Sequence, residues 1–366
     1  MLETNQVDIK KIDEHSNYFG SLYVNSLAAT TEVRVPYHII KGNSKGPVVC
    51  LLSTQHGWEP MGAEILRRAL LRVDEKKLNG TIISIPLAHP FTVEFGGTIE
   101  SSGQRVSPAD NLDLNQQWPG ANKNAWLTQQ IAYVIWNNLI KKCEYMIDYH
   151  DGTGATDELP VAFAHAFADK EPYFSASGIE GTETSDNYNH INHEYITNMN
   201  NEIKKLSVAF GSEIIWWREY SLNPKMLTAQ CALNGIKPLV VEAGGGCIID
   251  DTMNPSVECT LNILKHLKMI EGDPVIPKTQ KMVTNYYVYR SLSGGHFLKN
   301  DNFKIGTDVS KGDELGKVLH PLTSKILETC KSPLNGKIVS SRIKMPINPG
   351  GYIAHIADYD SIIWEK

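Results

Sequence analysis

The 366-residue sequence lacks the features that mark several large classes of protein. No apolar run approaches the ~20 residues that a membrane-spanning helix requires. Its 35 lysines and arginines do not outnumber its 41 aspartates and glutamates, whereas a nucleic-acid-binding face normally needs an excess of positive charge. The amino-terminal segment is polar and of mixed charge, without the apolar stretch of a secretory signal. We therefore expect a cytoplasmic protein that binds neither nucleic acid nor membranes.

Cysteine is also scarce, and no two cysteines form a CxxC pair. Six scattered cysteines in a chain of this length indicate small buried apolar residues in a reducing compartment instead of a disulfide framework. A zinc site built from thiolates is excluded for the same reason. Any bound metal must therefore be held by histidine and carboxylate side chains.

Short apolar segments alternate with amphipathic ones through roughly the first 270 residues. This alternation is typical of an α/β fold, with a mixed, largely parallel sheet flanked by helices. The expected strands are 48–52, 81–86, 145–149, 161–166, 213–217 and 238–241, and the expected helices are 60–78, 126–142, 193–210 and 223–233.

The pattern changes near residue 275, where short β-rich pieces begin to alternate with glycine, proline, asparagine and aspartate turns. A chain of this length is too long for one ordinary core. We therefore expect an α/β domain over residues 1–275 and a small all-β domain over residues 276–366.

Ionisable side chains follow two of the expected strands. His56 and Glu59 lie in a tight turn after the first, and Asp148 and His150 share one face at the end of the third. Two imidazoles and a carboxylate form a ligand set used by hydrolytic zinc sites, and Asp148 can fix the tautomer of a ligand from behind. A lone HxxE motif is common by chance, and most histidines are surface or core residues, so only the joint pattern favours a metal site.

A further carboxylate, Glu242, ends the apolar strand 238–241 and precedes three consecutive glycines. Reactive groups in α/β proteins collect at the carboxyl ends of the strands. The bend would place Glu242 over the same site, although a solvent-exposed loop carboxylate is the simpler alternative.

Four sequence blocks carry a resemblance to a known family. They are QHGWEPMG at 55–62, NLDLNQQWPG at 111–120, DYHD at 148–151 and VEAG at 241–244. In order and spacing they resemble the succinylglutamate desuccinylase/aspartoacylase family, which is part of the wider zinc carboxypeptidase group. The resemblance implies a zinc-carboxypeptidase-like α/β fold, with one zinc ion per chain on His56, Glu59 and His150.

The resemblance also implies roles for three more residues. Glu242 falls on the family's catalytic glutamate, which acts first as a general base and then as the proton donor to the leaving amine. Arg105 is the nearest match to an arginine that polarises the scissile carbonyl, and Asn115 matches an asparagine that helps to hold the substrate's carboxylate. The expected activity is that of a zinc-dependent amidohydrolase, a deacylase of small acylated amines or amino-acid derivatives.

One position departs from the family pattern, because Gln116 stands where the family usually has an arginine. A glutamine cannot form the two-pronged pair that a guanidinium forms with a carboxylate. Either another arginine, such as Arg218, makes this contact, or the substrate lacks an α-carboxylate at this place; an inert substitution is the third reading. Substrates with a neutral or basic moiety are favoured over succinylglutamate and N-acetylaspartate.

Two other functions remain open, a metallocarboxypeptidase that acts on peptides and a non-catalytic binding protein that keeps the fold. The carboxy-terminal segment has turns similar to those of biotinyl/lipoyl-like domains, but no lysine stands at the expected modification tip, so we expect no attached cofactor. This domain would serve as a lid, as a contact in a possible homo-oligomer or as a structural appendage.

Overall fold

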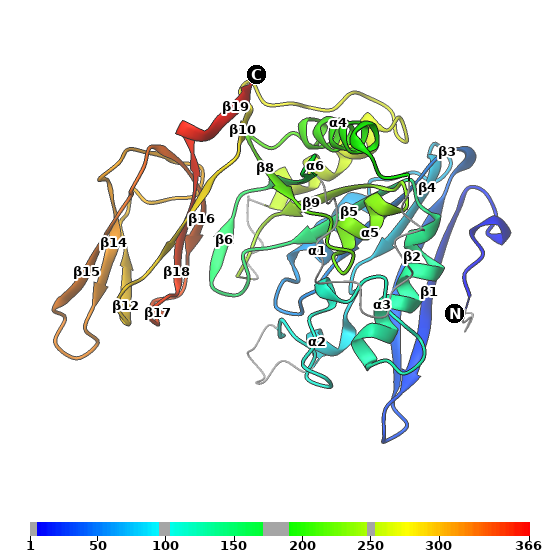
Figure 1. The fold of residues 1–366 in the computed structure, drawn as a ribbon, viewed down its shortest axis with the longest axis horizontal. Helices are drawn as coiled ribbons and strands as arrows, with labels where there is room; N and C mark the ends of the chain where they lie inside the picture. Colours follow the sequence, from blue (N-terminus) through cyan, green and yellow to red (C-terminus); the bar gives the residue numbers. More distant parts are fainter. Residues whose placement is uncertain (1–5, 95–102, 171–189, 247–252) are drawn as a thin grey trace.

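A computed structural model describes residues 6–94, 103–170, 190–246 and 253–366, and its centre is a ten-stranded mixed sheet (Figure 1). The strand order is β1-β2-β4-β3-β5-β9-β7-β8-β10-β19. The strands are β1 (Ser16–Ser26), β2 (Glu32–Lys41), β3 (Asn43–Ser53), β4 (Asn79–Ile85), β5 (Tyr145–His150), β7 (Val161–Phe167), β8 (Ile214–Tyr220), β9 (Lys237–Glu242), β10 (Lys281–Val283) and β19 (Ile362–Glu365).

The parallel strands β3, β5 and β9 lie side by side in the middle of this sheet. Their register aligns Leu52 with Asp148, and His150 with Glu242. The carboxyl ends of the three strands therefore meet at one edge of the sheet, where reactive groups of α/β proteins gather.

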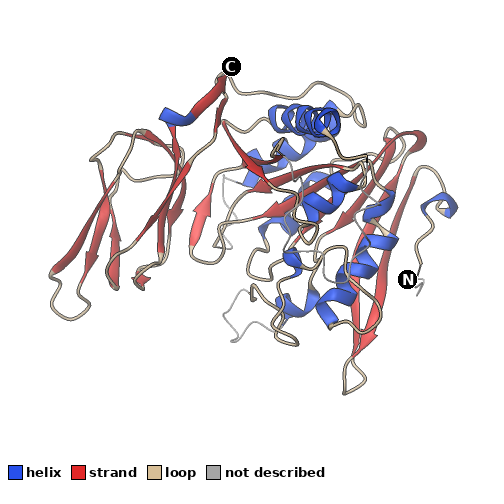
Figure 2. Ribbon diagram, in the orientation of Figure 1, coloured by secondary structure: helices blue, strands red, loops and turns tan. Residues whose placement is uncertain are grey.

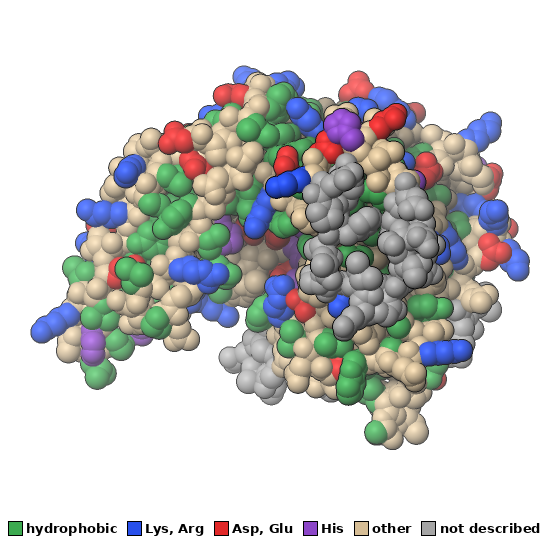
Figure 3. Space-filling view, viewed as in Figure 1, with side chains coloured by type: hydrophobic (Ala, Val, Ile, Leu, Met, Phe, Trp, Pro, Cys, Tyr) green, Lys and Arg blue, Asp and Glu red, His purple; other side chains and the backbone are tan. Residues whose placement is uncertain are grey.

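Two small antiparallel sheets stand beside the large one (Figure 2). One follows the order β11-β18-β16-β13 and is extended by β6, and the other follows β15-β14-β12-β17. Figure 3 shows a hollow between these sheets and the body of the molecule. The strands are β6 (Thr156–Glu158), β11 (Tyr286–Arg290), β12 (Gly295–Lys299), β13 (Asp308–Val309), β14 (Glu314–Leu319), β15 (Ile326–Lys331), β16 (Gly336–Arg342), β17 (Pro346–Ile347) and β18 (Tyr352–Asp358).

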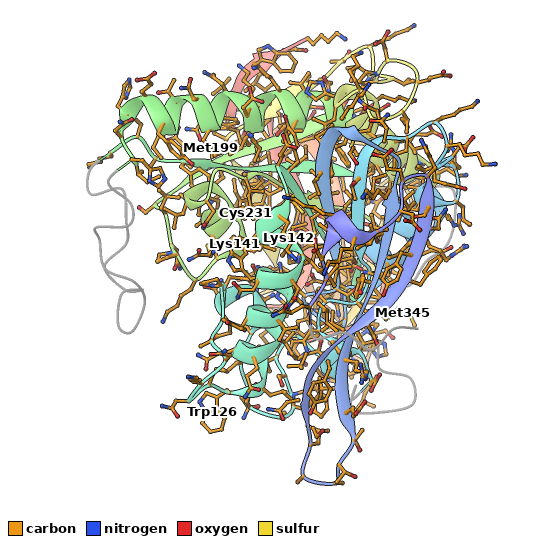
Figure 4. All side chains as sticks on the ribbon, turned by 90° about the vertical axis from the view of Figure 1, so that its right-hand side faces the viewer. Trp126, Lys141, Lys142, Met199, Cys231 and Met345 are labelled. Carbon is orange, nitrogen blue, oxygen red and sulfur yellow. The ribbon has the colours of Figure 1, made fainter. Side chains whose placement is uncertain are left out.

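Helices cover both faces of the large sheet. Helices α1, α4 and α6 share one hydrophobic cluster on one face, α3 contributes to a second cluster on the other, and α5 contributes to both clusters. Figure 4 shows Met199 on the side of α4 that faces the body, and Trp126, which is 66% exposed, at the periphery before α3. The helices are α1 (Met61–Leu70), α2 (Pro90–Glu94), α3 (Leu127–Asn138), α4 (His193–Phe210), α5 (Leu227–Leu233) and α6 (Met253–His266), with 3-10 turns at η1 (Ile9–Lys11), η2 (Leu114–Gln116), η3 (Ile140–Lys142) and η6 (Tyr359–Ser361).

The expected fold class is confirmed, since a mixed, mostly parallel sheet with helices is joined by small antiparallel sheets. Every strand expected in the first 275 residues is present, but the first helix ends at Leu70 instead of 78. The sequence did not indicate the β1–β2 hairpin or α6.

Strands are exchanged across the expected boundary at residue 275. Strand β6 pairs with β16 of the carboxy-terminal segment, while β10 and β19 of that segment join the large sheet. The division into domains 1–275 and 276–366 stays a proposal.

Five cysteines are free and buried, as the sequence predicts, and Cys247 lies outside the described residues. The described helices include none that is long and apolar enough to cross a membrane.

Candidate metal centre

The turn between β3 and α1 carries the first two of the predicted metal ligands. The backbone N–H of Glu59 donates to the carbonyl of His56 (3.1 Å), which closes the turn and directs both side chains inward. Gly57 permits a close approach of two segments, since a Cβ atom there would lie 2.0 Å from the carbonyl oxygen of Thr92. Gly57 also donates to the carbonyl of Gln104 (2.7 Å), so this contact fixes the backbone next to Arg105.

The third predicted ligand, His150, is the last residue of β5 and meets the other two. Oε2 of Glu59 lies 2.9 Å from Nδ1 of His56 and 2.7 Å from Nδ1 of His150. The two imidazole centroids are 5.0 Å apart, and all three side chains are buried. One possible ligand atom from each residue lies within 4.8 Å of the others, so the three can surround a single ion.

A carboxylate stands behind each imidazole. Oδ1 of Asp113 lies 3.1 Å from Nε2 of His56, and Oδ2 of Asp148 lies 3.2 Å from Nε2 of His150. With Nε2 held by an acid, each ring presents Nδ1 to the shared centre, which is the arrangement that orients histidine ligands in metal sites. The donor set and its outer partners therefore fit a divalent cation such as zinc.

A hydrogen-bonded chain holds Asp148 in place. Nε2 of Gln55 donates to Oδ2 of Asp148 (2.6 Å), and Nε1 of the buried Trp118 donates to Oε1 of Gln55 (2.8 Å). The hydrogen bond from Trp118 fixes the side-chain amide of Gln55 so that its nitrogen faces the carboxylate of Asp148. The chain links the turn after β3 to the segment that follows η2.

The electrostatics of the centre favour positive charge. Burial alone would lower the pKa of His150, but the carboxylates of Asp148 and Glu59 outweigh it and raise this pKa well above its ordinary value. For His56, the opposing effect of burial is outweighed by Glu59 and Asp113, and the pKa is raised as well. Burial opposes the ionisation of Glu59, yet both imidazoles overcome it and lower the pKa of the carboxyl group. A divalent cation would satisfy the same carboxylates.

Glu242 ends β9 directly opposite His150 and is partly buried. Burial raises the pKa of its carboxyl group well above the usual range, and the charge of Glu158 adds to this effect. Raised carboxyl pKa values are common among proton-transferring groups in active sites. Glu242 thus stands beside the candidate metal centre without being one of the three clustered ligands.

The remaining predicted residues lie in the segment that leads to η2. The guanidinium of Arg105, which is 47% exposed, pairs with Oδ2 of Asp113 at 3.0 Å. Asn115 and Gln116 belong to η2, and the backbone N–H of Asn115 donates to Oδ1 of Asp113 (3.0 Å). Arg105 and Asn115 are therefore connected to the centre through one carboxylate, and their roles towards a substrate stay predictions.

Sequence reasoning missed three polar residues that support the centre. Asp113 connects His56, Arg105 and η2, and the DLN block that contains it was the available signal. Gln55 lies in the QHGWEPMG motif, which gives no sign of its hydrogen bond to Asp148. Asp151 accepts from the backbone N–H groups of Met61 and Thr153, and burial raises its pKa well above normal.

Fold and site together define an α/β protein with a histidine–carboxylate centre at the carboxyl ends of parallel strands. Residues 45–197 match the model described as the succinylglutamate desuccinylase/aspartoacylase catalytic domain. This match confirms the resemblance that the motifs of this region predicted, and the family is one of metal-dependent deacylases.

Similarity to known proteins extends over nearly the whole chain. The N-alpha-acetyl-L-2,4-diaminobutyric acid deacetylase of Halomonas elongata is 22% identical over 341 residues, which cover 91% of this chain and 88% of the relative. Two solved structures share the fold. The product-bound ectoine utilization protein EutE (DoeB) from Ruegeria pomeroyi has a TM-score of 0.73 at 21% identity and covers 94% of this chain and 96% of its own. A succinylglutamate desuccinylase from Silicibacter sp. TM1040 has a TM-score of 0.75 at 19% identity and covers 98% and 100%.

Proposed function

We propose that this protein is a zinc-dependent deacylase that hydrolyses the amide bond of a small N-acylated amine or amino-acid derivative. The observation that carries the proposal is the convergence of His56, Glu59 and His150, with Glu242 opposite His150 in the neighbouring strand. The relative from Halomonas elongata, named as a deacetylase of an N-acetylated diamino acid, supports both the reaction type and a basic substrate.

Each predicted residue has a defined task in this reaction. His56, Glu59 and His150 would hold the ion, which when bound supplies a Lewis acid and lowers the pKa of water. Glu242 takes the proton of the attacking water and delivers it to the nitrogen of the leaving amine, because amide cleavage needs a base first and an acid afterwards.

The segment around η2 would position the substrate. The guanidinium of Arg105 can donate to the carbonyl oxygen, where negative charge develops in the transition state. Asn115 and the neutral Gln116 would contact the remainder of the substrate through amide hydrogen bonds.

Hydrolysis of a compound panel by the metal-stripped and zinc-reloaded protein tests the proposal. The panel contains N-acetyl and N-succinyl amino acids and amines, together with short peptides. We expect zinc-dependent release of amine from a small acyl compound. Glu242→Gln should keep its zinc and lose about 10²–10⁴ in rate, because the proton-transfer group is gone.

Glu219→Gln, which removes an exposed carboxylate of β8, is the matched control and should keep full activity. Cleavage of carboxy-terminal peptide bonds alone would instead identify a metallocarboxypeptidase. A protein that binds acyl compounds but hydrolyses none would be a binding protein, and full activity of Glu242→Gln would remove that residue from the mechanism.

A further inference from the structure

A row of polar side chains crosses the small sheet that faces the body of the molecule. Strand β16 pairs with β6 and with β18, and the register places Ser340 opposite both Glu158 and His355. Directly opposite residues in antiparallel strands point to the same face. Nδ1 of His355 lies 3.5 Å from Oε1 of Glu158. Glu158 and Ser340 are buried, at 4% and 1% exposure, so this row is not a solvated surface.

Tyr286 of β11 belongs to the same face, because it pairs with Ala357, two residues beyond His355. Its ring stacks on Trp216 with centroids 4.2 Å apart, and Trp216 stacks in turn on Phe163 at 4.1 Å. This stack fixes the tyrosine ring and therefore the position of its hydroxyl group. Tyr286 is 8% exposed, and its buried hydroxyl has no hydrogen-bond partner among the described residues.

More than one hydrogen-bonding atom of the row is unsatisfied. Besides the hydroxyl of Tyr286, Oγ of Ser340 and Nε2 of His355 are buried and have no partner in the described part of the chain. Buried polar groups in native proteins are almost always hydrogen-bonded, so several orphaned atoms in one row require an explanation. They indicate a place where a polar ligand completes the hydrogen bonds.

The row lies next to Glu242. The backbone N–H of Gly244 donates to the carbonyl oxygen of Glu158 (2.9 Å), and Val161 pairs with Glu242 itself. The carboxylates of Glu158 and Glu242 both act on the hydroxyl of Tyr286, whose pKa is raised well above normal by burial and then by these two charges. Figure 3 shows acidic and histidine side chains within the hollow between the small sheets and the body.

The charges of this region select the kind of ligand. Over the described ranges, neither Glu158 nor Glu242 has a lysine or arginine within ion-pair distance. An ammonium group supplies positive charge and three hydrogen-bond donors, which suit the carboxyl groups of Glu158 and Glu242 better than an anion would. A carboxylate and two hydroxyl groups are suitable acceptors for those donors.

We propose that Glu158, Tyr286, Ser340 and His355 form a subsite that binds a second, cationic amine on the leaving-group part of the substrate. The assignment rests on the proposed deacylase function, in which Glu242 faces the departing nitrogen. Because the subsite adjoins Glu242, the ammonium group belongs to the amine product and not to the acyl group. The favoured substrate class is therefore an N-acylated diamine or diamino acid with one free amine.

The first experiment compares two substrates on Glu158→Gln. One is an N-acetylated diamino acid with a free side-chain ammonium, and the other is the N-acetyl amino acid with an uncharged side chain of equal length. Removal of one partner of a buried charge pair has a large cost, so kcat/KM for the cationic substrate should fall by about thirtyfold or more. The neutral substrate should change by less than about threefold, since it makes no ion pair with Glu158.

Tyr286→Phe tests the subsite independently in case Glu158→Gln does not fold, because it keeps the aromatic stack and removes only the hydroxyl group. It should lower kcat/KM for the cationic substrate by about tenfold or more, as expected for loss of one hydrogen bond to a charged group. Glu219→Gln is again the matched control and should leave the ratio of the two substrates unchanged. Equal losses for both substrates in Glu158→Gln would overturn the subsite.

A binding measurement separates the subsite from the deacylase proposal. Calorimetry on the zinc-loaded protein uses 2,4-diaminobutyrate, with 2-aminopentanoate as the monoamine of equal length. The diamine should bind at least about tenfold more tightly, and Glu158→Gln should abolish this preference. If no acyl compound is hydrolysed but this preference is present and depends on Glu158, the deacylase function fails and the subsite stands. If hydrolysis occurs without any diamine preference, the subsite fails alone.

Discussion

The metal side of the site, formed by the three clustered ligands and their carboxylate partners, differs from the amine side, the proposed ammonium subsite, in which polar atoms lack a partner. On the metal side Oδ1 of Asp148 has none among the described residues, but the imidazole nitrogens are all paired. On the metal side, Nε2 of each imidazole has a carboxylate partner, Asp113 or Asp148, and both Nδ1 atoms face Glu59. On the amine side, the hydroxyl groups of Tyr286 and Ser340 have no partner within the described residues.

The difference separates a centre that the protein orients by itself from one that needs a ligand. Because its outer carboxylates already hold the rings, the metal side is prepared to receive a small ion with little rearrangement. The amine side has unsatisfied groups, and these provide specificity because a ligand without the matching atoms leaves them unpaired. Changes on the metal side should therefore abolish activity, while changes on the amine side should redirect it.

The largest effect is expected from Glu59→Gln, which removes the carboxylate that both histidines face. The site should lose its zinc, measured as metal per chain by mass spectrometry, and kcat should fall by about a thousandfold or more, since the ion contributes several kcal/mol to the transition state. Glu64→Gln, in the helix α1 that follows this turn, is the matched control, because Glu64 pairs with Arg67 and Arg68 at the surface. Undiminished zinc in Glu59→Gln would contradict the ligand assignment.

This contrast also explains what the sequence could predict. His56, Glu59 and His150 follow expected strands within short motifs, so local spacing and the parallel register bring them together. Glu158, in contrast, acquires its neighbours through β6–β16 pairing between segments about 180 residues apart, with an irregular register between β16 and β18. No periodicity in the sequence specifies that pairing.

The fold follows the same division. The alternation of apolar and amphipathic segments predicted the central strands of the sheet, because burial on both faces leaves a clear apolar run such as 48–52. The β1–β2 hairpin was missed although β2 alternates buried and partly exposed residues, and the return of β19 was missed because four residues are too few for an alternation to be distinctive. Arg105 and Asn115 were found through the family resemblance, whereas the role of Asp113, which lies in the same block as Asn115, became clear only from its contacts.

A second prediction concerns the outer carboxylates and has an intermediate effect. Asp148→Asn should weaken zinc binding by about 10–100-fold, because a neutral amide is a weaker acceptor behind His150 than a carboxylate and reduces the basicity of the ring. Asp113→Asn should have a smaller effect, since the Asp113 side chain is 16% exposed against 2% for Asp148, and water can replace it. Competition with a chromophoric chelator gives both dissociation constants. A larger loss of zinc affinity in Asp113→Asn would reverse this ranking. It would show that the more exposed pair, His56 and Asp113, contributes more to metal binding than His150 and Asp148.

The smallest effect on activity is expected from a substitution of Arg218. This residue would add a contact to the substrate carboxylate to those of the metal side and the amine side. Arg218 pairs with His165, and Glu242 pairs with Val161 on the same strand, β7. Because Val161, Phe163 and His165 alternate along β7, all of these side chains lie on one face of the sheet. The guanidinium lies over the rings of Trp216 (5.7 Å) and Tyr220 (4.9 Å). It has no carboxylate partner in the described part of the chain, and it is exposed to solvent.

If Arg218 binds the substrate carboxylate with which Gln116 cannot form an ion pair, Arg218→Gln should raise KM about tenfold for an N-acetyl amino acid and leave kcat nearly unchanged. The corresponding N-acetyl amino-acid amide, which lacks the negative charge, should show the same KM in both proteins. Gln116→Arg in the Arg218→Gln background should restore much of the loss, because it returns a guanidinium near the substrate. An equal rise in KM for the acid and the amide would mean that Arg218 acts by packing on its two aromatic neighbours, and the carboxylate would then have to be held elsewhere.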